Sequence, residues 1–471
     1  MKKIIFIGLI IGLGACKTVE VKQEPELLQM PDKYGTFLIN STNSDFSWET
    51  VFQDSSLKFY IHKSLNHNLD IAQAKQQILM NESHILHARG LLLPNLNSFN
   101  SFGQRRFGAY TMDGIGNFDT NFSPNLTEDQ FIPEHLPDFL IGFQSSWEVD
   151  VWSKLRNKKA SAVARYLASQ EGLTWLMTNI VANTAQIYYE LIAIEAELDI
   201  INETRILQDR ALQIIRLQKS AGKVNELAVN QFEAQLLNFN AMAVQREMDK
   251  KLLQNAFFNV MGVYPQPLTV SSREVLEQDL EITLFSPKEL IEKRPDIKAA
   301  EYELMAHRHD VLSAKAAFYP KLELNALMGF QTFNPSFILS PQSLTYSLFG
   351  NLSAPLLNRK ALMAEFDYTS SGKMKAFYQY QQSLLEAYFE VFNQTITIDT
   401  LEEIIELKER ESNVMASALE NSNELFLSGN ANYLEIVVAR TNLLQSQLEL
   451  IHANRDQKIA YINLYRSLGG G

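Results

Sequence analysis

The sequence predicts a mainly α-helical chain that carries four short β-strands and is built from two copies of one repeat. Three observations predict this fold class: an internal duplication, two very long stretches without proline, and short segments in which apolar and polar residues alternate. The chain has 471 residues, of which 46% are hydrophobic and 20% charged, as is ordinary for folded protein.

The duplication is visible without any gap. Residues 68–103 align on residues 294–329 at an offset of 226, so that Asp70 falls on Asp296 (296 − 70). Farther along, Gly222 falls on Gly429 at an offset of 207 (429 − 222). We therefore expect each half of the chain to follow the same order of helices and strands.

The two long stretches are residues 155–261 and 359–468, which contain no proline and few glycines. Gly222 and Gly429 interrupt them, so each half should hold a helix of about 60 residues followed by one of about 40. At about 1.5 Å per residue these helices span roughly 60 to 100 Å, more than one globular domain needs. A 3-4 spacing of apolar residues predicts packing of the last helix against neighbouring helices, through Leu434, Val437, Thr441, Leu444, Leu448 and Ile451.

Each half opens with a shorter helix that stops at a proline and is followed by two strand-like segments. We expect the helices at 69–91 and 295–318 and the strands at about 94–106, 139–151, 320–332 and 344–356. The last three strands alternate cleanly, and the first does so less cleanly. One apolar and one polar face suit the wall of a membrane β-barrel, but also a half-buried sheet in a soluble domain.

Four strands in one chain are too few for a closed wall, because an open sheet edge cannot face lipid. A membrane location would therefore require an oligomer. On these grounds alone, a dimer and a trimer both satisfy the requirement. Beyond the N-terminus the sequence has no apolar run of 18 residues, so we expect no transmembrane helix.

The N-terminus predicts export and a lipid anchor. Two lysines, an apolar run from Ile4 to Leu13 and small residues before Cys16 form a secretory signal peptide. Leu13-Gly14-Ala15-Cys16 also resembles the lipobox of bacterial lipoproteins, which implies a diacylglycerol on the Cys16 sulfur of a chain that starts there. Lys17, in place of the aspartate that favours retention in the inner membrane, indicates the outer membrane.

These features give the following expected organisation. A signal peptide (1–15) is followed by a lipid-anchored extension (16–46), a first repeat (47–264), a connector (265–286) and a second repeat (287–471). The net charge of −12 is spread along the chain, which argues against nucleic acid as a partner. In the connector, Leu280, Ile282 and Leu284 alternate like a short strand.

The duplication, the stretch Arg294-Pro295-Asp296-Ile297 and the paired helical hairpins resemble the TolC superfamily. The lipobox and the closing segment 465–470 are similar to its lipoprotein branch, the OprM-like or NodT-type outer-membrane factors. The resemblance implies a trimer with a 12-stranded outer-membrane β-barrel continued by a long periplasmic α-helical barrel. It also implies a passive exit duct for drugs or other small solutes, joined to a periplasmic adaptor and an inner-membrane pump of the RND type.

Within this resemblance, the turns of the two helical hairpins are the periplasmic tips, where the adaptor docks. Gly222 and Leu227 match the first tip, and Gly429 and Leu434 match the second. A helix-capping glycine followed by a buried leucine explains the same residues structurally. The acidic residue that usually lines the closed aperture falls on Val438, and Glu435 and Arg440 are the alternative lining candidates, although a solvated helix position explains each of them more readily.

Little in the sequence predicts an enzyme. Patterns for an acyl-transfer serine, a zinc protease, a P-loop and a dinucleotide site are absent from the sequence, and we expect no cofactor. His84 and His87 lie three residues apart on an expected helix, but a third metal ligand is not evident, so we expect no metal site. Trp147 and Trp152 fit either a membrane-interface girdle or core packing. A lipoprotein scaffold without a pore and a duct for type I protein secretion remain alternatives.

Overall fold

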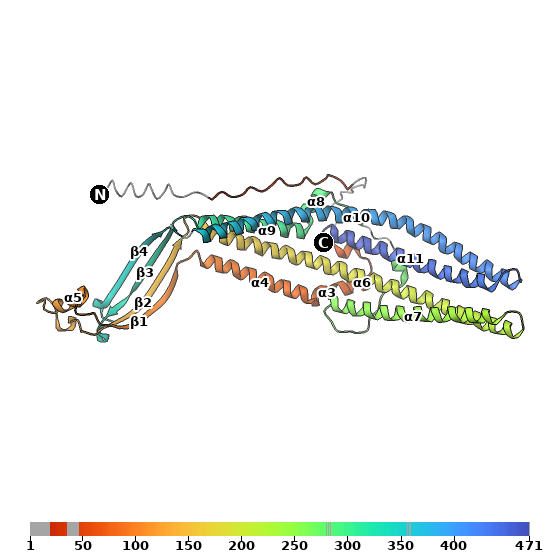
Figure 1. Cartoon of the computed structure of the whole chain (residues 1–471), viewed down its shortest axis with the longest axis horizontal. Helices are drawn as coiled ribbons and strands as arrows, with labels where there is room; N and C mark the ends of the chain where they lie inside the picture. Colours follow the sequence, from red (N-terminus) through yellow and green to blue (C-terminus); the bar gives the residue numbers. More distant parts are fainter. Residues whose placement is uncertain are drawn as a thin grey trace. The chain divides into compact units, whose positions relative to one another are not determined.

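A computed structural model describes residues 19–34, 47–278, 280, 282, 284–355, 357 and 359–470. The chain forms two compact units, each assembled from separated stretches (Figure 1). Of the described residues, unit 1 draws on those within 19–25, 80–166 and 302–377, and unit 2 on those within 26–34, 47–79, 167–301 and 378–470. Cys16, the predicted site of lipid attachment, lies outside the described residues.

The two halves of the sequence share the order of two helices, two strands, a long helix and a shorter one, as the duplication predicts, and α2 and α5 are additions in the first half. The first half contains α2 (Trp48–Val51), α3 (Ser55–His67), α4 (Leu69–Gly90), β1 (Asn95–Arg105), α5 (Met112–Thr120), β2 (Leu136–Val149), α6 (Lys154–Ser220) and α7 (Glu226–Val260). The second contains α8 (Pro287–Lys293), α9 (Pro295–Ala316), β3 (Lys321–Thr332), β4 (Leu344–Ser353), α10 (Lys360–Leu427) and α11 (Tyr433–Ser467). Short 3-10 turns lie at η1 (Glu128–Gln130), η2 (Arg273–Leu276), η3 (Pro335–Phe337) and η4 (Pro341–Ser343).

Unit 1 is organised around one four-stranded antiparallel sheet in the order β1-β2-β3-β4 (Figure 1). The two hairpins of the sequence repeat therefore meet at β2 and β3, which pair over eleven residues from Phe139↔Thr332 to Val149↔Leu322. Because the sheet is open, β1 and β4 each keep one edge without a backbone partner in the single chain.

Residues 19–25 form part of unit 1 although they are far away in sequence from its other stretches. Val19 and Val21 pack against a small core of Val311, Phe318 and Phe366. Glu24 accepts a hydrogen bond from Arg308 Nε at 2.9 Å, and Lys373 Nζ donates to the Lys22 carbonyl oxygen at 2.5 Å. The hydrogen bond from Arg308 holds the pKa of the Glu24 carboxyl below its ordinary value. Few sequence signals pointed to this segment, which has no periodic pattern.

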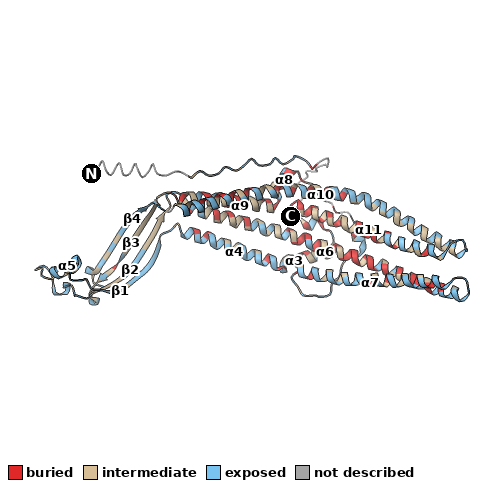
Figure 2. Cartoon of the chain, viewed as in Figure 1, coloured by how far each residue is buried: buried red, intermediate tan, exposed pale blue. Residues whose placement is uncertain are grey.

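Unit 2 holds the larger core, whose buried residues line the facing sides of the helices (Figure 2). Aromatic side chains carry much of it: Phe52 and Tyr465 pack edge to face with 5.6 Å between ring centroids, and both are fully buried. Burial and the nearby Asp54 carboxylate raise the pKa of Tyr188 to about 12, and its hydroxyl donates to Asp54 at 2.7 Å.

Arg294 ties three parts of unit 2 together and is 1% exposed. Its guanidinium donates to Asp296 at 2.9 and 2.6 Å, to Glu390 at 2.8 Å and to the Ser467 carbonyl oxygen at 2.9 Å. It also lies 5.0 Å from the ring of Trp175. Arg294 thus fixes the start of α9, the middle of α10 and the end of α11.

The connector between the halves differs from the sequence prediction. Among the described residues of this segment, Leu280, Ile282 and Leu284 lie in no strand. Leu280 is 7% exposed, and the other two pack against the cores of unit 2. Their alternation reflects burial of every second side chain against helices. Periodicity alone does not distinguish such a segment from a β-strand.

Candidate functional site

The sheet of unit 1 has two chemically different faces. Residues paired across neighbouring strands share a face, and alternate residues along a strand point to opposite faces. One face is mainly apolar, with Leu96, Phe102, Phe139, Ile141, Phe143, Trp147, Val149, Leu322, Leu324, Ala326, Met328, Phe330, Leu344, Tyr346, Leu348 and Leu352. The other is mainly polar, with Asn95, Asn97, Ser101, Arg105, Asp138, Gln144, Ser146, Glu148, Lys321, Glu323, Asn325, Gln331, Thr345, Ser347, Asn351 and Ser353.

The apolar face is exposed in the single chain. Leu348 is 74% exposed and Tyr346 is 80% exposed. A sheet that bares its apolar side over all four strands needs an apolar environment, and in a soluble protein such a patch marks an interaction surface. This arrangement fits a wall with hydrocarbon on one side.

The charges of the polar face compensate one another. Near one end of the strands, Asp138 accepts from Gln331 at 2.8 Å and lies 3.8 Å from Arg105. Near the other end, Glu148 lies 3.1 Å from Lys154 Nζ and 3.3 Å from Lys321 Nζ. Paired charges keep this face hydrophilic without a large net field, as suits a water-filled passage.

Gly142 and Gly329 face each other in the two central strands, on the polar face. A Cβ on Gly142 would lie 2.4 Å from the Met328 carbonyl oxygen and 2.6 Å from the Gly329 Cα. Only glycine fits, so this pair allows the closest approach of β2 and β3.

The predicted tryptophans both make hydrogen bonds at the helix-strand junction. Trp147 Nε1 donates to the Leu92 carbonyl oxygen at 3.0 Å, and Trp152 Nε1 donates to the Pro320 carbonyl oxygen at 2.8 Å. Trp152 also stacks on Tyr319 and is 47% exposed. A hydrogen-bonded indole N–H on a ring that stays partly exposed agrees with either an interface girdle or local packing.

In unit 2, the two helical hairpins turn through the same motif (Figure 1). Gly222 has φ of 72° and its amide donates to the Lys219 carbonyl oxygen, while Lys223 donates to Gln218. Gly429 has φ of 78°, and Gly429 and Asn430 donate to Phe426 and Leu425 in the same way. These paired bonds form Schellman caps, which require the left-handed conformation that glycine adopts most readily.

Asparagines begin the helices that leave the two turns. Asn225 accepts from the Ala228 amide at 3.1 Å and Asn432 from the Leu434 amide at 3.4 Å. Leu227 and Leu434, which stand in the first turn of those helices, are 55% and 45% exposed. The structural explanation of a buried leucine is therefore wrong for the single chain, and both turns present an apolar side chain on a rigid cap.

The three aperture candidates lie on α11 just beyond the second turn, but in different surroundings. Glu435 and Val438 are exposed and border a groove of about 400 Å³ between α10 and α11. Arg440 instead turns toward α6, where its Nη1 donates to Gln208 Oε1 at 3.0 Å. Its Nε is buried without a hydrogen-bond partner among the described residues, and burial lowers the pKa of its guanidinium.

The hairpins contact each other close to these turns. Leu212, Ile215, Val229 and Phe232 of the first hairpin form a buried cluster against which Phe426, Tyr433 and Val437 of the second pack. Gln235 Nε2 donates to Thr441 Oγ1 at 3.1 Å, which adds a polar link beside that of Arg440. The apolar spacing placed Val437 and Thr441 on the side of α11 that packs against neighbouring helices, but it did not show which residues of the first hairpin they meet.

The remaining predicted features can be placed briefly. His84 and His87 are both exposed on α4, and within the described ranges no group of three or more His, Cys, Asp or Glu side chains could hold a metal ion. In the part of the chain that the structure covers, the helices lack an apolar window long enough to cross a membrane.

The sequence profile described as outer membrane efflux protein matches residues 60–263 and 286–470. The chain belongs to this family. The two matched stretches are the two halves of the duplication, and the family identifies the chain as an outer-membrane protein of an efflux system, as predicted.

Members of the outer membrane efflux protein family match over nearly the whole chain. The cation efflux system protein CusC of Escherichia coli K12 is 23% identical over 469 residues, covering 98% of this chain and 97% of CusC. SilC of Salmonella typhimurium, a probable outer membrane lipoprotein, is 23% identical over all of this chain and 98% of its own. The open-state structure of the MtrE outer membrane channel of Neisseria gonorrhoeae has a TM-score of 0.82 at 17% identity, covering 97% of this chain and 98% of MtrE, and confirms the fold.

Proposed function

We propose that three copies of this efflux protein form a passive exit duct for drugs or other small solutes. The observation that supports it most directly is the four-stranded sheet with one apolar face, one polar face and two open edges. Three such sheets joined edge to edge give a closed wall of twelve strands, whose apolar side faces lipid and whose polar side surrounds water. The resemblance to the TolC superfamily favours three copies over two.

The hairpin turns are the proposed docking points for a periplasmic adaptor, which connects the duct to an inner-membrane pump of the RND type. Gly222 and Gly429 hold the turns in one conformation, and Leu227 and Leu434 are exposed on them. A rigid turn with an exposed leucine supplies an apolar anchor at little entropic cost. Energy for export then comes from the pump, and the duct transports without catalysing a reaction.

Glu435 and Val438 are the proposed lining of the aperture, because both are exposed beside the second turn. Arg440 has another role in this scheme: its bond to Gln208 braces the second hairpin against the first. An aperture lined by Val438 constricts by apolar contact, and one carboxylate per copy remains at Glu435.

We also propose that Cys16 carries the lipid anchor and that residues 16–46 form a lipid-anchored extension preceding two repeats at 47–264 and 287–471, joined by a connector at 265–286. Two or more acyl chains at about 0.8 kcal/mol per buried methylene would hold the N-terminus in the membrane stably. Replacing Cys16 with serine should release the N-terminus from lipid, which radiolabelled palmitate incorporation measures directly.

The function is tested by planar-bilayer conductance of the detergent-purified protein, with the oligomer mass measured on the same sample. We expect a trimer whose channel is closed most of the time and opens with small conductance steps. A monomer that never conducts, even after substitution of the tip residues, would instead indicate a lipoprotein scaffold without a pore.

Docking is tested separately with the double variant Leu227→Asp/Leu434→Asp. We expect it to conduct as a trimer in bilayers yet fail to restore drug resistance in cells that lack the protein. Leu86→Asp is the matched control, since Leu86 is 70% exposed on α4 and belongs to neither turn. Full resistance with the double variant would refute docking through these leucines.

A further inference from the structure

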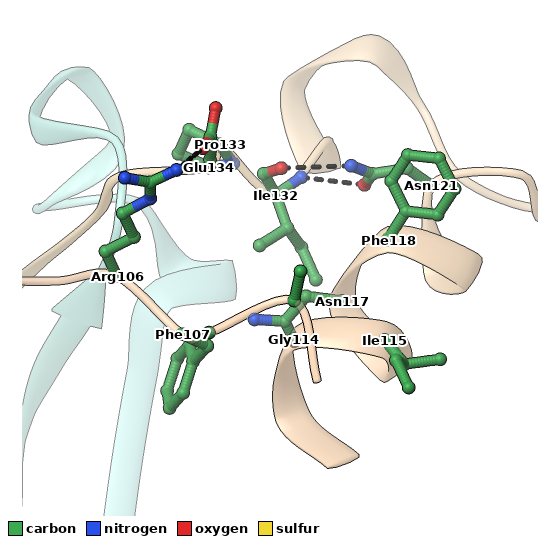
Figure 3. A pocket seen from close by; sticks show the side chains of 12 residues that line it. Arg106, Phe107, Gly114, Ile115, Asn117, Phe118, Asn121, Ile132, Pro133 and Glu134 are labelled. Atoms are coloured by element: carbon green, nitrogen blue, oxygen red, sulfur yellow. Dashed lines mark hydrogen bonds and ion pairs between the residues drawn. The ribbon is translucent and has the colours of Figure 1, made fainter. Parts of the chain in front are cut away.

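The segment between β1 and β2 is a folded unit of its own. Arg106 and Glu134 form an ion pair where the segment leaves and rejoins the sheet. The Asn121 side chain donates to the Ile132 carbonyl oxygen and accepts from the Ile132 amide, both at 2.9 Å, and so joins two parts of the segment as a strand pair would (Figure 3). Thr111 caps α5 by accepting from the Gly114 amide at 3.1 Å.

Gly114 shows how closely this segment is packed. A Cβ at Gly114 would lie 2.1 Å from the Gly108 carbonyl oxygen. Residues 108–137 contain several glycines and prolines, as surface loops commonly do. The structure adds that they build a defined fold, in contrast with a long flexible connection.

This folded segment nevertheless exposes large apolar side chains. None of the residues of α5 is buried. Phe118 of this helix is 65% exposed, and Tyr110, just before it, is fully exposed. Phe107, Ile115, Phe118, Ile132 and Pro133 also line a pocket of about 790 Å³ (Figure 3). Apolar side chains ordered around an open pocket indicate a surface that is covered by a partner.

The strand directions indicate which surface comes next to this pocket. β1 ends at Arg105, where the segment begins, and β1 is an edge strand. The other free edge of the sheet belongs to β4, which begins at Leu344, directly after the β3–β4 turn. Joining β1 of one copy to β4 of the next in the antiparallel sense places Arg105 and Leu344 at the same end of the wall.

The β3–β4 turn, residues 333–343, has the chemistry that the pocket accepts. Between Glu323 and Arg359 the sequence contains no Asp, Glu, Lys, Arg or His. Leu339 of this turn is 74% exposed, and residues 333–343 of the same chain do not line the pocket. The two charged side chains at the pocket, Arg106 and Glu134, already pair with each other.

We propose that the pocket of the β1–β2 segment receives the β3–β4 turn of a second copy, with Leu339 of that copy packed against Ile115 and Phe118. The inference rests on the proposed oligomeric wall and extends it: three such contacts form an apolar collar around one mouth of the duct. The collar links each copy to the next beyond the strands and narrows that mouth.

The test uses the full-length protein in native outer membranes, with Ile115→Cys and Leu339→Cys combined. A bis-maleimide that bridges about two strand spacings, roughly 10 Å, is added before denaturing electrophoresis. We expect a covalent trimer band, because three contacts close a ring. Either single variant should give none, which controls for Cys16. Asn125→Cys with Leu339→Cys is the matched control, since Asn125 is exposed on the same segment but does not line the pocket.

The mass of the unlabelled variant distinguishes a failure of the proposed duct from a failure of the proposed collar. A mass other than a trimer would overturn the proposed duct itself. A trimer without cross-links at Ile115→Cys, or with equal cross-links at Asn125→Cys, would overturn the collar alone. Labelling of Ile115→Cys by a membrane-soluble maleimide but not by the cross-linker would also overturn it and would assign this surface to lipid.

Discussion

Replacing Arg294 with methionine should loosen unit 2 locally far more than an ordinary surface substitution does. Methionine keeps an unbranched apolar stem of similar reach, so the change removes mainly the guanidinium. Four hydrogen bonds are lost, to Asp296, Glu390 and the Ser467 carbonyl oxygen, and two carboxylates lose their nearest cation. Removing one partner from a buried ion pair typically destabilises by about 3–5 kcal/mol.

The lower end of that range applies here. Side-chain exposure is 21% for Asp296 and 35% for Glu390, so water can reach both carboxylates once the cation is gone. A loss of about 3 kcal/mol corresponds to a roughly 100-fold larger opening equilibrium, at about 1.4 kcal/mol per factor of ten. The effect should concentrate where Arg294 connects α9, α10 and the end of α11.

Hydrogen exchange followed by mass spectrometry measures this opening at the peptides covering residues 290–298 and 464–470. We expect exchange there to accelerate by about two orders of magnitude, with little change in the sheet. Arg410→Met is the matched control, because Arg410 and Glu406 form a 3.8 Å pair that is 72% and 70% exposed. If Arg294→Met and Arg410→Met exchange alike, the assignment of Arg294 as a structural link is refuted.

Three further predictions concern the turns, the sheet and the N-terminal segment. Gly222→Ala and Gly429→Ala should each destabilise their turn by about 1–2 kcal/mol, because alanine is strained at positive φ. Hydrogen exchange at the turns should accelerate, whereas Gly172→Ala, in the middle of α6 with open space around it, should slow exchange slightly. Gly142→Ala should prevent β2 and β3 from pairing and abolish heat-stable oligomers on electrophoresis, while Gly103→Ala, with nothing within 4 Å, should not. Since the pKa of Glu24 is lowered in the folded chain, its contribution to stability is present above its ordinary value of 4.5 and is lost as the pH falls through the lowered value. Protease cleavage of residues 19–34 should therefore increase at acidic pH in the native protein, and Glu24→Gln should cleave fast at every pH; a pH response that survives in Glu24→Gln would contradict this origin.

Much of the architecture followed from local signals. The prolines at Pro94 and Pro320 and the glycines at Gly222 and Gly429 mark helix ends by their backbone chemistry alone, and the helices end there within a few residues. Alternation located three strands because their apolar and polar faces differ. The alternation of the first strand was less clear because Ser98 and Asn100 lie on its apolar face. Only their pairing with Phe143 and Ile141 shows which face that is.

What the sequence could not predict depends on partners distant in the chain. In the sequence, Arg294 stands out only as part of the stretch that resembles the family, whereas its bond to Glu390 joins residues 96 positions apart. Arg440 was a candidate for the aperture, and its position against Gln208 depends on how the two hairpins pack. The segment at 19–34 has no periodicity, since an extended chain held by a few separate polar contacts needs none.

The two open edges of the sheet have a consequence for the life of the protein before assembly. A newly exported copy carries β1 and β4 with unsatisfied backbone groups, and such edges pair readily with any other strand. In the proposed wall, closure is an encounter between copies, so its rate should rise with their concentration, and misdirected strand pairing should compete with it. Assembly of the proposed duct would therefore favour rapid delivery of the copies or an escort that covers the edges of β1 and β4 until matching copies meet.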